Sequence, residues 1–197
     1  MPRYLAATRP GSSSRVLEID PGVIALDRSQ LALGSVRNLV VDVEDARLGL
    51  RDEQAGGRDL VIGDAFGGLA VPWQLTTREV VSAIARIVGP EGIYAVNIID
   101  NPPNRFVHAE AATIAAVFPF VAVVAEGPEI SGGRGGNFVV VASAAPLPLT
   151  PLQERLAARG SSLEVAAGGR LAGFISGAEI LTDDHAPVDQ LLTPVHR

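Results

Sequence analysis

The chain has 197 residues, of which 47% are hydrophobic, and a formal net charge of −6 at pH 7. This length and composition predict a folded domain with a core and exclude general disorder. There is no cysteine and no lysine, which excludes disulfides, thiolate metal sites, cysteine nucleophiles and lysine Schiff bases. The acidic balance disfavours nucleic acid as a partner. No apolar run is long enough for a membrane helix or a signal peptide, so we expect a cytoplasmic protein.

The first part of the chain alternates short apolar strands with helices. We predict strands at 15–20, 38–47 and 58–66, and a helix that begins at Pro21, where proline is well tolerated. Acidic residues stand at or near the end of each strand. Strand and helix in alternation indicate an α/β fold.

An amphipathic helix and a strand–helix pair follow. The apolar spacing predicts a helix over 75–89, with Thr76 and Glu79 at the spacing of a capping box. A strand at 92–100 and a helix at 104–119 come next.

Two apolar strands, 120–127 and 137–145, flank a glycine-rich segment. We expect them to pair in antiparallel fashion, followed by a short helix at 150–160. The SGGRGG stretch at 131–136 runs from strand to strand rather than from strand to helix, so we interpret it as a connecting loop and not as a phosphate loop. A mostly parallel sheet with helices on both faces and a C-terminal antiparallel hairpin is typical of the methyltransferase type of Rossmann-like fold.

Three acidic residues, Glu18, Asp45 and Asp64, lie at or just past the ends of three successive predicted strands. Ligands of open α/β sheets bind outside the carboxyl ends of the strands. The three carboxylates therefore indicate a binding site. The alternative is that each is a helix N-cap or loop acid.

Five stretches together resemble the spermidine synthase family, and in particular its bacterial spermidine synthase-like branch. They are VLEIDPGVIAL, VEDAR, DLVIGDAFGGLAVPWQLTTREVV, GIYAVNIID and LTDDHAPVDQL. The resemblance covers nearly the whole chain and implies a methyltransferase fold. It also implies transfer of an aminopropyl group from decarboxylated S-adenosylmethionine to an amine such as putrescine.

The resemblance implies a role for four residues. Glu18 matches the acid that binds the ribose hydroxyls, and a carboxylate has the two acceptor oxygens that a vicinal diol needs. Asp45 and Ala46 match the pair that recognises adenine, through a carboxylate acceptor and a backbone N–H donor. Asp64 matches the first acid of the D-S-S-D-P motif and is the candidate catalytic residue.

The chain departs from the family pattern at the second acid of that motif, where it has Gly67. In the family this acid helps to deprotonate the attacking amine. The two tyrosines, Tyr4 and Tyr94, do not match the family's usual substrate-lining positions. Three functions stay open: aminopropyl transfer, methyl transfer from S-adenosylmethionine, and a non-catalytic binding or assembly module.

The tail carries an acidic stretch with one histidine: Asp183, Asp184, His185 and Asp189. Its spacing matches no known metal-ligand pattern, and we expect no metal. A helix start, with Thr182 or Asp183 as cap and Pro187 in the first turn, is one interpretation. An acidic lip for a cationic substrate is the other.

Two further side chains are candidates for packing rather than chemistry. His108 falls within the predicted helix 104–119 with no recognisable acid or nucleophile partner. Trp73 lies beside the predicted site and could form a wall of it, although a lone aromatic residue more often packs in the core.

The position of strand 15–20 in the family fold predicts that the central first strand and its glycine-rich turn precede Met1. We therefore expect a single methyltransferase-like domain over 1–197 that is incomplete at its N-terminus, and a homodimer is possible. Three explanations of the missing strand stay open: a start codon assigned too late, which we favour, a strand supplied by a partner chain, and direct pairing of strands 15–20 and 58–66.

Overall fold

The computed structural model describes residues 1–68 and 71–193. The chain forms two compact units, Met1–Asp52 and Glu53–Arg197. Each is described by itself below.

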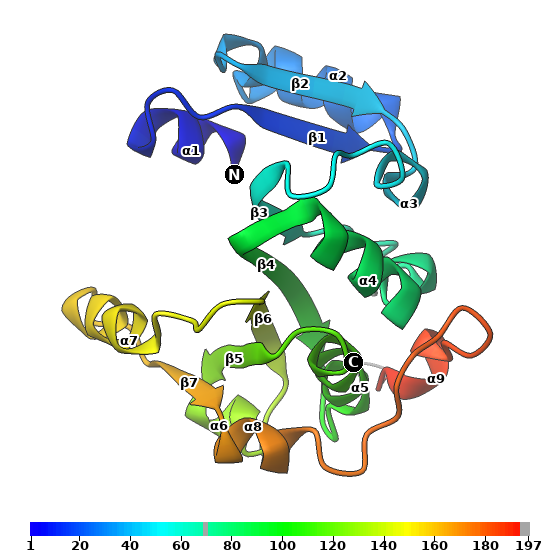
Figure 1. Ribbon diagram of the computed structural model, residues 1–197, viewed down its shortest axis with the longest axis vertical. Helices are drawn as coiled ribbons and strands as arrows, with labels where there is room; N and C mark the ends of the chain where they lie inside the picture. The colour runs from blue at the N-terminus through cyan, green and yellow to red at the C-terminus, as the bar shows by residue number, and fades with distance from the viewer. Residues whose placement is uncertain (69–70, 194–197) are drawn as a thin grey trace. The chain divides into compact units, whose positions relative to one another are not determined.

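The first unit contains two parallel strands with helices before, between and after them (Figure 1). Its elements are α1 (Pro2–Thr8), β1 (Ser14–Glu18), α2 (Pro21–Gln30), the 3-10 turn η1 (Leu33–Ser35), β2 (Leu39–Val43) and α3 (Ala46–Gly49). The register runs from Ser14 beside Leu39 to Glu18 beside Val43. Asp20 caps α2, because its carboxylate accepts the Gly22 N–H at 2.7 Å.

The second unit is built on a five-stranded sheet in the order β3-β4-β6-β5-β7. Its first elements are β3 (Arg58–Gly63), η2 (Trp73–Leu75), α4 (Arg78–Ile87), β4 (Val88–Asp100), α5 (Arg105–Ala115) and β5 (Phe120–Glu126). Its later elements are α6 (Gly127–Ile130), β6 (Gly136–Ser143), α7 (Leu149–Ala158), β7 (Leu163–Ala167), α8 (Gly169–Phe174) and α9 (Val188–Leu191). Strands β3, β4 and β5 run in one direction, and β6 and β7 run in the other.

The predicted antiparallel pair is present as β5 and β6. The connection between them consists of the short helix α6 followed by the segment 131–136, whose last residue begins β6, so this segment is a loop as expected. Its Arg134 pairs with Glu126 and Glu129, which holds the loop against the end of β5. The sheet also has an edge strand that the sequence analysis did not predict, β7, which pairs with β5.

The two parallel pairs belong to different sheets, β1 with β2 and β3 with β4.

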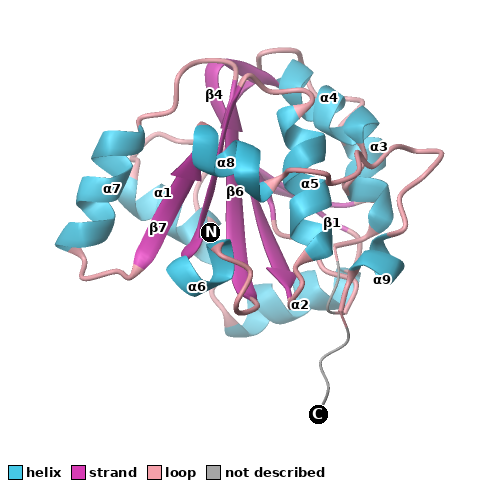
Figure 2. Cartoon of the chain, turned by 90° about the horizontal axis from the view of Figure 1, so that it is seen from below, coloured by secondary structure: helices cyan, strands magenta, loops and turns pink. Residues whose placement is uncertain are grey.

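Helices α4, α5 and α8 pack on one face of the five-stranded sheet, and α7 packs on the other (Figure 2). Phe174 of α8 packs against one aromatic ring on α5 and one on β6. Its ring centre lies 4.4 Å from that of His108 on α5 and 6.2 Å from that of Phe138 on β6. On the other face, leucines of α7 cover Ala122, Val124 and Val165.

Two predicted boundaries were wrong. Helix α4 begins at Arg78 with Thr77 as its N-cap, so Thr76 and Glu79 do not form a capping box. The Glu79 carboxylate accepts the backbone N–H of Asp183 instead. Strand β4 begins at Val88 rather than at residue 92, because the chain passes from α4 into the strand through Gly89 and Pro90 without a loop.

No helix within the described ranges is long and apolar enough to cross a membrane. Within the same ranges, no three histidine, aspartate or glutamate side chains gather closely enough to hold a metal ion.

Candidate functional site

The first unit brings Glu18 and Asp45 to the same edge of its sheet. Glu18 is the last residue of β1, and Asp45 follows the end of the parallel neighbour β2. The two strand ends are joined by the backbone of Glu44, whose N–H donates to the Glu18 carbonyl at 3.0 Å. This is the carboxyl edge, where ligands of parallel sheets bind.

Asp45 is the N-cap of α3, as the structural alternative proposed. Its Oδ1 accepts the Arg47 N–H at 2.8 Å. Ala46, the first helical residue, has a backbone N–H with no hydrogen-bond partner among the described residues. The pair therefore presents an acceptor oxygen and a free donor side by side, which is the donor set that an adenine edge requires.

Glu18 is half-buried, and its Oε1 accepts the Asp20 N–H at 2.9 Å. Within the described ranges its Oε2 has no partner. The turn thus fixes the carboxylate through one oxygen and leaves the other open. A vicinal diol that donates two hydroxyl protons fits this arrangement.

Asp64 belongs to the second unit and follows directly after β3. Its side chain is exposed, and its Oδ1 accepts a hydrogen bond from Asn97 Nδ2 on the neighbouring strand β4 at 3.1 Å. Asn97 was not predicted as a site residue from the sequence. Its place in the apolar run of 92–100, one strand over from Asp64, was the available signal.

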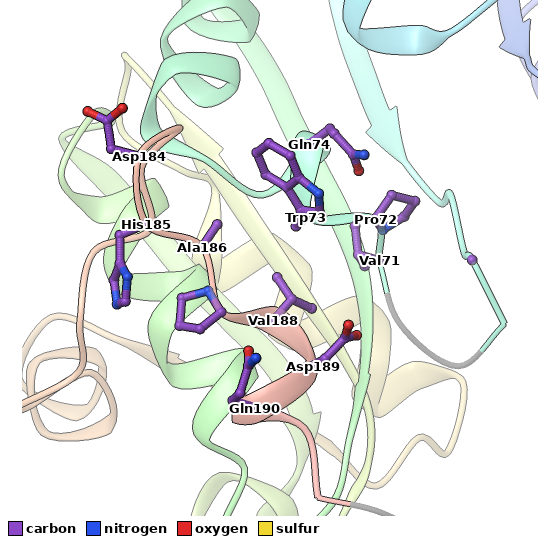
Figure 3. A pocket seen from close by; sticks show the side chains of 12 residues that line it. Val71, Pro72, Trp73, Gln74, Asp184, His185, Ala186, Val188, Asp189 and Gln190 are labelled. Atoms are coloured by element: carbon purple, nitrogen blue, oxygen red, sulfur yellow. The ribbon is translucent and has the colours of Figure 1, made fainter.

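The second unit contains a cavity of about 430 Å³, lined by residues that follow Asp64 in the sequence (Figure 3). One wall is formed by residues 71–74 and the other by residues 184–190. Gly67, which lies between Asp64 and the first wall in the sequence, also lines the cavity. Asp184 and Asp189 lie at opposite ends of the second wall (Figure 3). No arginine lines the described part of the cavity, so its electrostatic potential favours cations.

Trp73 lines the first wall and is 45% exposed, which agrees with its interpretation as a wall of the site. Gly67, the residue at the family's second acid position, also lines the cavity and offers no side chain there. Tyr94 does not line it, because its ring is buried in the core. Burial raises the pKa of the Tyr94 phenol far above its usual range.

The acidic tail stretch does not begin a helix at Thr182 or Asp183, so that prediction was wrong. Residues Thr182 and His185 instead exchange two backbone hydrogen bonds of 2.9 and 3.0 Å and close a turn. Helix α9 begins only at Val188, with Pro187 as its N-cap. The Asp183 carboxylate is used elsewhere, since its Oδ1 accepts the Thr77 hydroxyl at 2.6 Å.

The two histidines with described roles differ in their surroundings. His185 lines the cavity, and its Nε2 lies 3.1 Å from Glu179 Oε2 at the surface. His108 is half-buried against Phe174, and this partial burial lowers its pKa. His108 is therefore a packed residue, as the sequence analysis expected.

A buried acid that the sequence analysis did not single out is Asp100, the last residue of β4. Its carboxylate accepts the N–H of Asn101 at 2.8 Å and that of Val107, in the first turn of α5, at 3.0 Å. Burial raises the pKa of Asp100, and these N–H donors oppose that rise. Asp100 thus ties the end of the strand to the start of the helix.

No protein-family model matches the chain. A curated relative, the polyamine aminopropyltransferase of Vibrio vulnificus strain CMCP6, is 28% identical over 120 residues. That match covers 60% of this chain and 40% of the relative, so the chain matches about two fifths of the relative's length.

Solved structures extend the likeness to almost the whole chain. A probable spermidine synthase from Corynebacterium glutamicum superposes with a TM-score of 0.83 at 28% identity, over 98% of this chain and 70% of that one. Human methyltransferase-like protein 13, solved in complex with SAH, superposes with a TM-score of 0.62 at 17% identity, over 96% of this chain and 83% of that one.

The second likeness shows the fold, and the first adds sequence identity over the same fold. Together they confirm the α/β methyltransferase fold and the family resemblance predicted from the sequence. The chain is spermidine synthase-like and has the Rossmann-like fold of the methyltransferases.

Proposed function

We propose that this protein transfers an aminopropyl group from decarboxylated S-adenosylmethionine to an amine bound in the cavity of the second unit. The observation that carries the proposal is the chemistry of that cavity. Its described lining combines two carboxylates, Asp184 and Asp189, with the exposed ring of Trp73 and no arginine. Carboxylates and an aromatic face attract an alkyl ammonium group, whose carbon chain also suits the apolar lining.

The first unit supplies the recognition of the co-substrate. Glu18 offers one fixed and one open carboxylate oxygen, which suit the ribose hydroxyls of a nucleoside. Asp45 and the free N–H of Ala46 suit the adenine edge. The names of the relatives, a polyamine aminopropyltransferase and a probable spermidine synthase, support aminopropyl transfer that involves a polyamine.

Asp64 is the candidate base for the transfer step. The amine lone pair attacks the propyl carbon that is bonded to the sulfonium sulfur, and the new N–C bond forms as the C–S bond breaks. The C–S electron pair stays on sulfur, which becomes a neutral thioether, and the proton from the amine passes to the Asp64 carboxylate. Asn97 donates to that carboxylate and fixes its orientation.

Gly67 favours a second candidate function. With glycine at the family's second acid position, the cavity lacks one carboxylate that could accept the amine proton. A protein that binds the amine or the nucleoside without transfer, or that transfers a methyl group from S-adenosylmethionine, would use the same recognition.

Calorimetric titrations separate these possibilities. We expect methylthioadenosine to bind the wild type and to bind the Glu18→Gln variant about 10- to 150-fold more weakly, since a charged hydrogen-bond acceptor contributes about 1.5–3 kcal/mol. The matched control is Asp27→Asn, which removes one charge from α2 of the same unit. Equal weakening by both variants would contradict the assignment of Glu18.

The amine half is tested in the same way. We expect putrescine to bind the wild type and to lose affinity in Asp189→Asn, while Glu154→Gln, on the opposite face of the sheet, leaves binding unchanged. Affinity that is unaffected by Asp189→Asn would place the amine elsewhere. Binding of both ligands without any transfer would favour the non-catalytic alternative.

A further inference from the structure

Both walls of the cavity are attached to the N-terminus of α4. The first wall reaches it along the chain, because Trp73 lies in the 3-10 turn η2, and Thr77 follows as the N-cap of α4. The second wall, residues 184–190, lies more than a hundred positions further along the chain. Its position relative to the first wall therefore depends on tertiary contacts.

Those contacts converge on the residues just before the second wall. The Arg78 N–H donates to the Leu181 carbonyl at 2.8 Å, and the Leu181 N–H donates to the Thr113 hydroxyl at 2.8 Å. Leu181 is fully buried. This pair of hydrogen bonds fixes the chain up to residue 181, at the base of the wall.

Asp183 makes the next attachment, and it makes two at once. Its carboxylate accepts the Thr77 hydroxyl at 2.6 Å, while its own N–H donates to the Glu79 carboxylate at 3.0 Å. Thr77 is fully buried and also accepts the Val80 N–H as the helix cap. Asp183 is thus bonded to two residues of the first turn of α4, the N-cap Thr77 and the second helical residue Glu79.

The turn from Thr182 to His185 connects Asp183 to the second wall. Its two backbone hydrogen bonds make the segment one rigid unit, with Asp183 inside it and Asp184 and His185 at the edge of the cavity. Asp183 itself does not line the cavity. A displacement at Asp183 would move the wall without removing any group that faces the ligand.

We propose that Asp183 is a positioning residue that sets the separation of the two cavity walls by anchoring the 182–185 turn to the first turn of α4. The separation of the walls then decides which cations fit between Trp73 and Asp189. That consequence rests on the proposed amine-binding function, whereas the anchoring itself does not.

Trp73 allows a direct test, because it is the single tryptophan of the chain and lines the wall opposite the anchored segment. Its fluorescence is quenched by acrylamide in proportion to its exposure. We expect Asp183→Ala to raise the quenching constant by up to about twofold, since the side chain is already 45% exposed. Asp183→Asn keeps an oxygen that accepts the Thr77 hydroxyl, and we expect it to match the wild type.

Two further variants exclude other causes. Asp184→Asn removes a neighbouring charge but no anchoring bond, and we expect no change in quenching. Glu79→Ala removes the acceptor of the Asp183 N–H, together with an exposed ion pair to Arg78, and we expect an intermediate rise. It serves as the test if Asp183→Ala does not fold, as judged by circular dichroism.

Unchanged quenching in a folded Asp183→Ala variant, or in Glu79→Ala if that variant alone folds, would overturn the proposal. An equal rise in Asp183→Ala and Asp183→Asn would also overturn it, because charge rather than the hydrogen bond would then matter. The measurement needs neither amine nor co-substrate. Its failure is therefore distinguishable from a failure of the proposed function.

Discussion

Replacing Glu110 by glutamine should change how the stability of this protein depends on pH. Glu110 lies on α5, is fully buried, and neither of its carboxylate oxygens has a hydrogen-bond partner among the described residues. Burial raises the pKa of this carboxyl well above its usual range. The nearby phenol of Tyr94 is also buried. We therefore expect Glu110 to keep its proton in the folded protein at pH values above the ordinary carboxyl pKa.

The sign of the effect follows from the two protonation states. Below the ordinary carboxyl pKa, the folded and unfolded chains both hold the proton, and Glu110 adds no pH dependence. Above it, the unfolded chain releases the proton and the folded chain keeps it. The free energy of unfolding then falls by about 1.4 kcal/mol for each pH unit, until the pH reaches the raised pKa of the folded state.

For a folded state that keeps the proton up to pH 7, this amounts to about 2–3 kcal/mol between pH 5 and pH 7, a large part of the stability of an ordinary domain. The Glu110→Gln variant has a side chain of nearly the same shape that cannot ionise. Urea unfolding of both proteins at pH 5 and pH 7 gives four free energies of unfolding. We expect the stability of the wild type relative to the variant to fall by about 2–3 kcal/mol over this interval.

All other titrating groups are common to the two proteins and cancel in the comparison. If the wild type and Glu110→Gln change equally with pH, then Glu110 does not hold its proton in the folded state, and the reasoning from its burial is refuted.

Three other changes have defined outcomes. Phe174→Ala removes a ring that packs on two aromatic neighbours, and we expect a loss of about 3–4 kcal/mol in urea unfolding; a loss below 1 kcal/mol would contradict the packing of α8. Thr113→Val removes the hydroxyl that accepts the Leu181 N–H, which should cost about 1–3 kcal/mol, whereas Thr113→Ser keeps it and should cost less. Asn97→Ala releases the Asp64 carboxylate; we expect a lower kcat for aminopropyl transfer with nearly unchanged putrescine affinity, and an unchanged kcat would remove Asn97 from the site.

Local patterns predicted much of the fold. The apolar spacing of 75–89 identified α4, and the apolar runs at 120–127 and 137–145 identified the β5 and β6 pair. Both signals come from short-range periodicity, which burial on one face imposes directly on the sequence. The run LEVAA at 163–167, between two serines and two glycines, carried a similar signal for β7 that was overlooked.

The parts that could not be predicted depend on side-chain contacts across long separations in the chain. The spacing of Thr76 and Glu79 suggested a capping box, but Glu79 is taken by Asp183, 104 positions away. Likewise, Asn97 orients Asp64 only because β3 and β4 are adjacent in the sheet. Local propensity contains no information on these pairings.

Some residues of the candidate site were predicted from the sequence, but the way they are arranged in space was predicted only in part. Glu18 and Asp45 do share one edge of the β1 and β2 sheet, as parallel strands require. The N-cap alternative offered for these acids is confirmed at Asp45, which caps α3, and the second oxygen of its carboxylate stays available as an acceptor for the proposed ligand. The cavity between residues 71–74 and 184–190 was suggested only as an acidic lip, because its second wall depends on the fold of the tail.

The most direct test of the central claim is the transfer reaction itself. The purified protein is incubated with decarboxylated S-adenosylmethionine and putrescine, and the products are identified by mass spectrometry. We predict equal amounts of methylthioadenosine and aminopropylated putrescine, loss of both products in Asp64→Asn, and normal amounts in Glu154→Gln. A folded wild type that forms neither product from these two substrates would contradict the account.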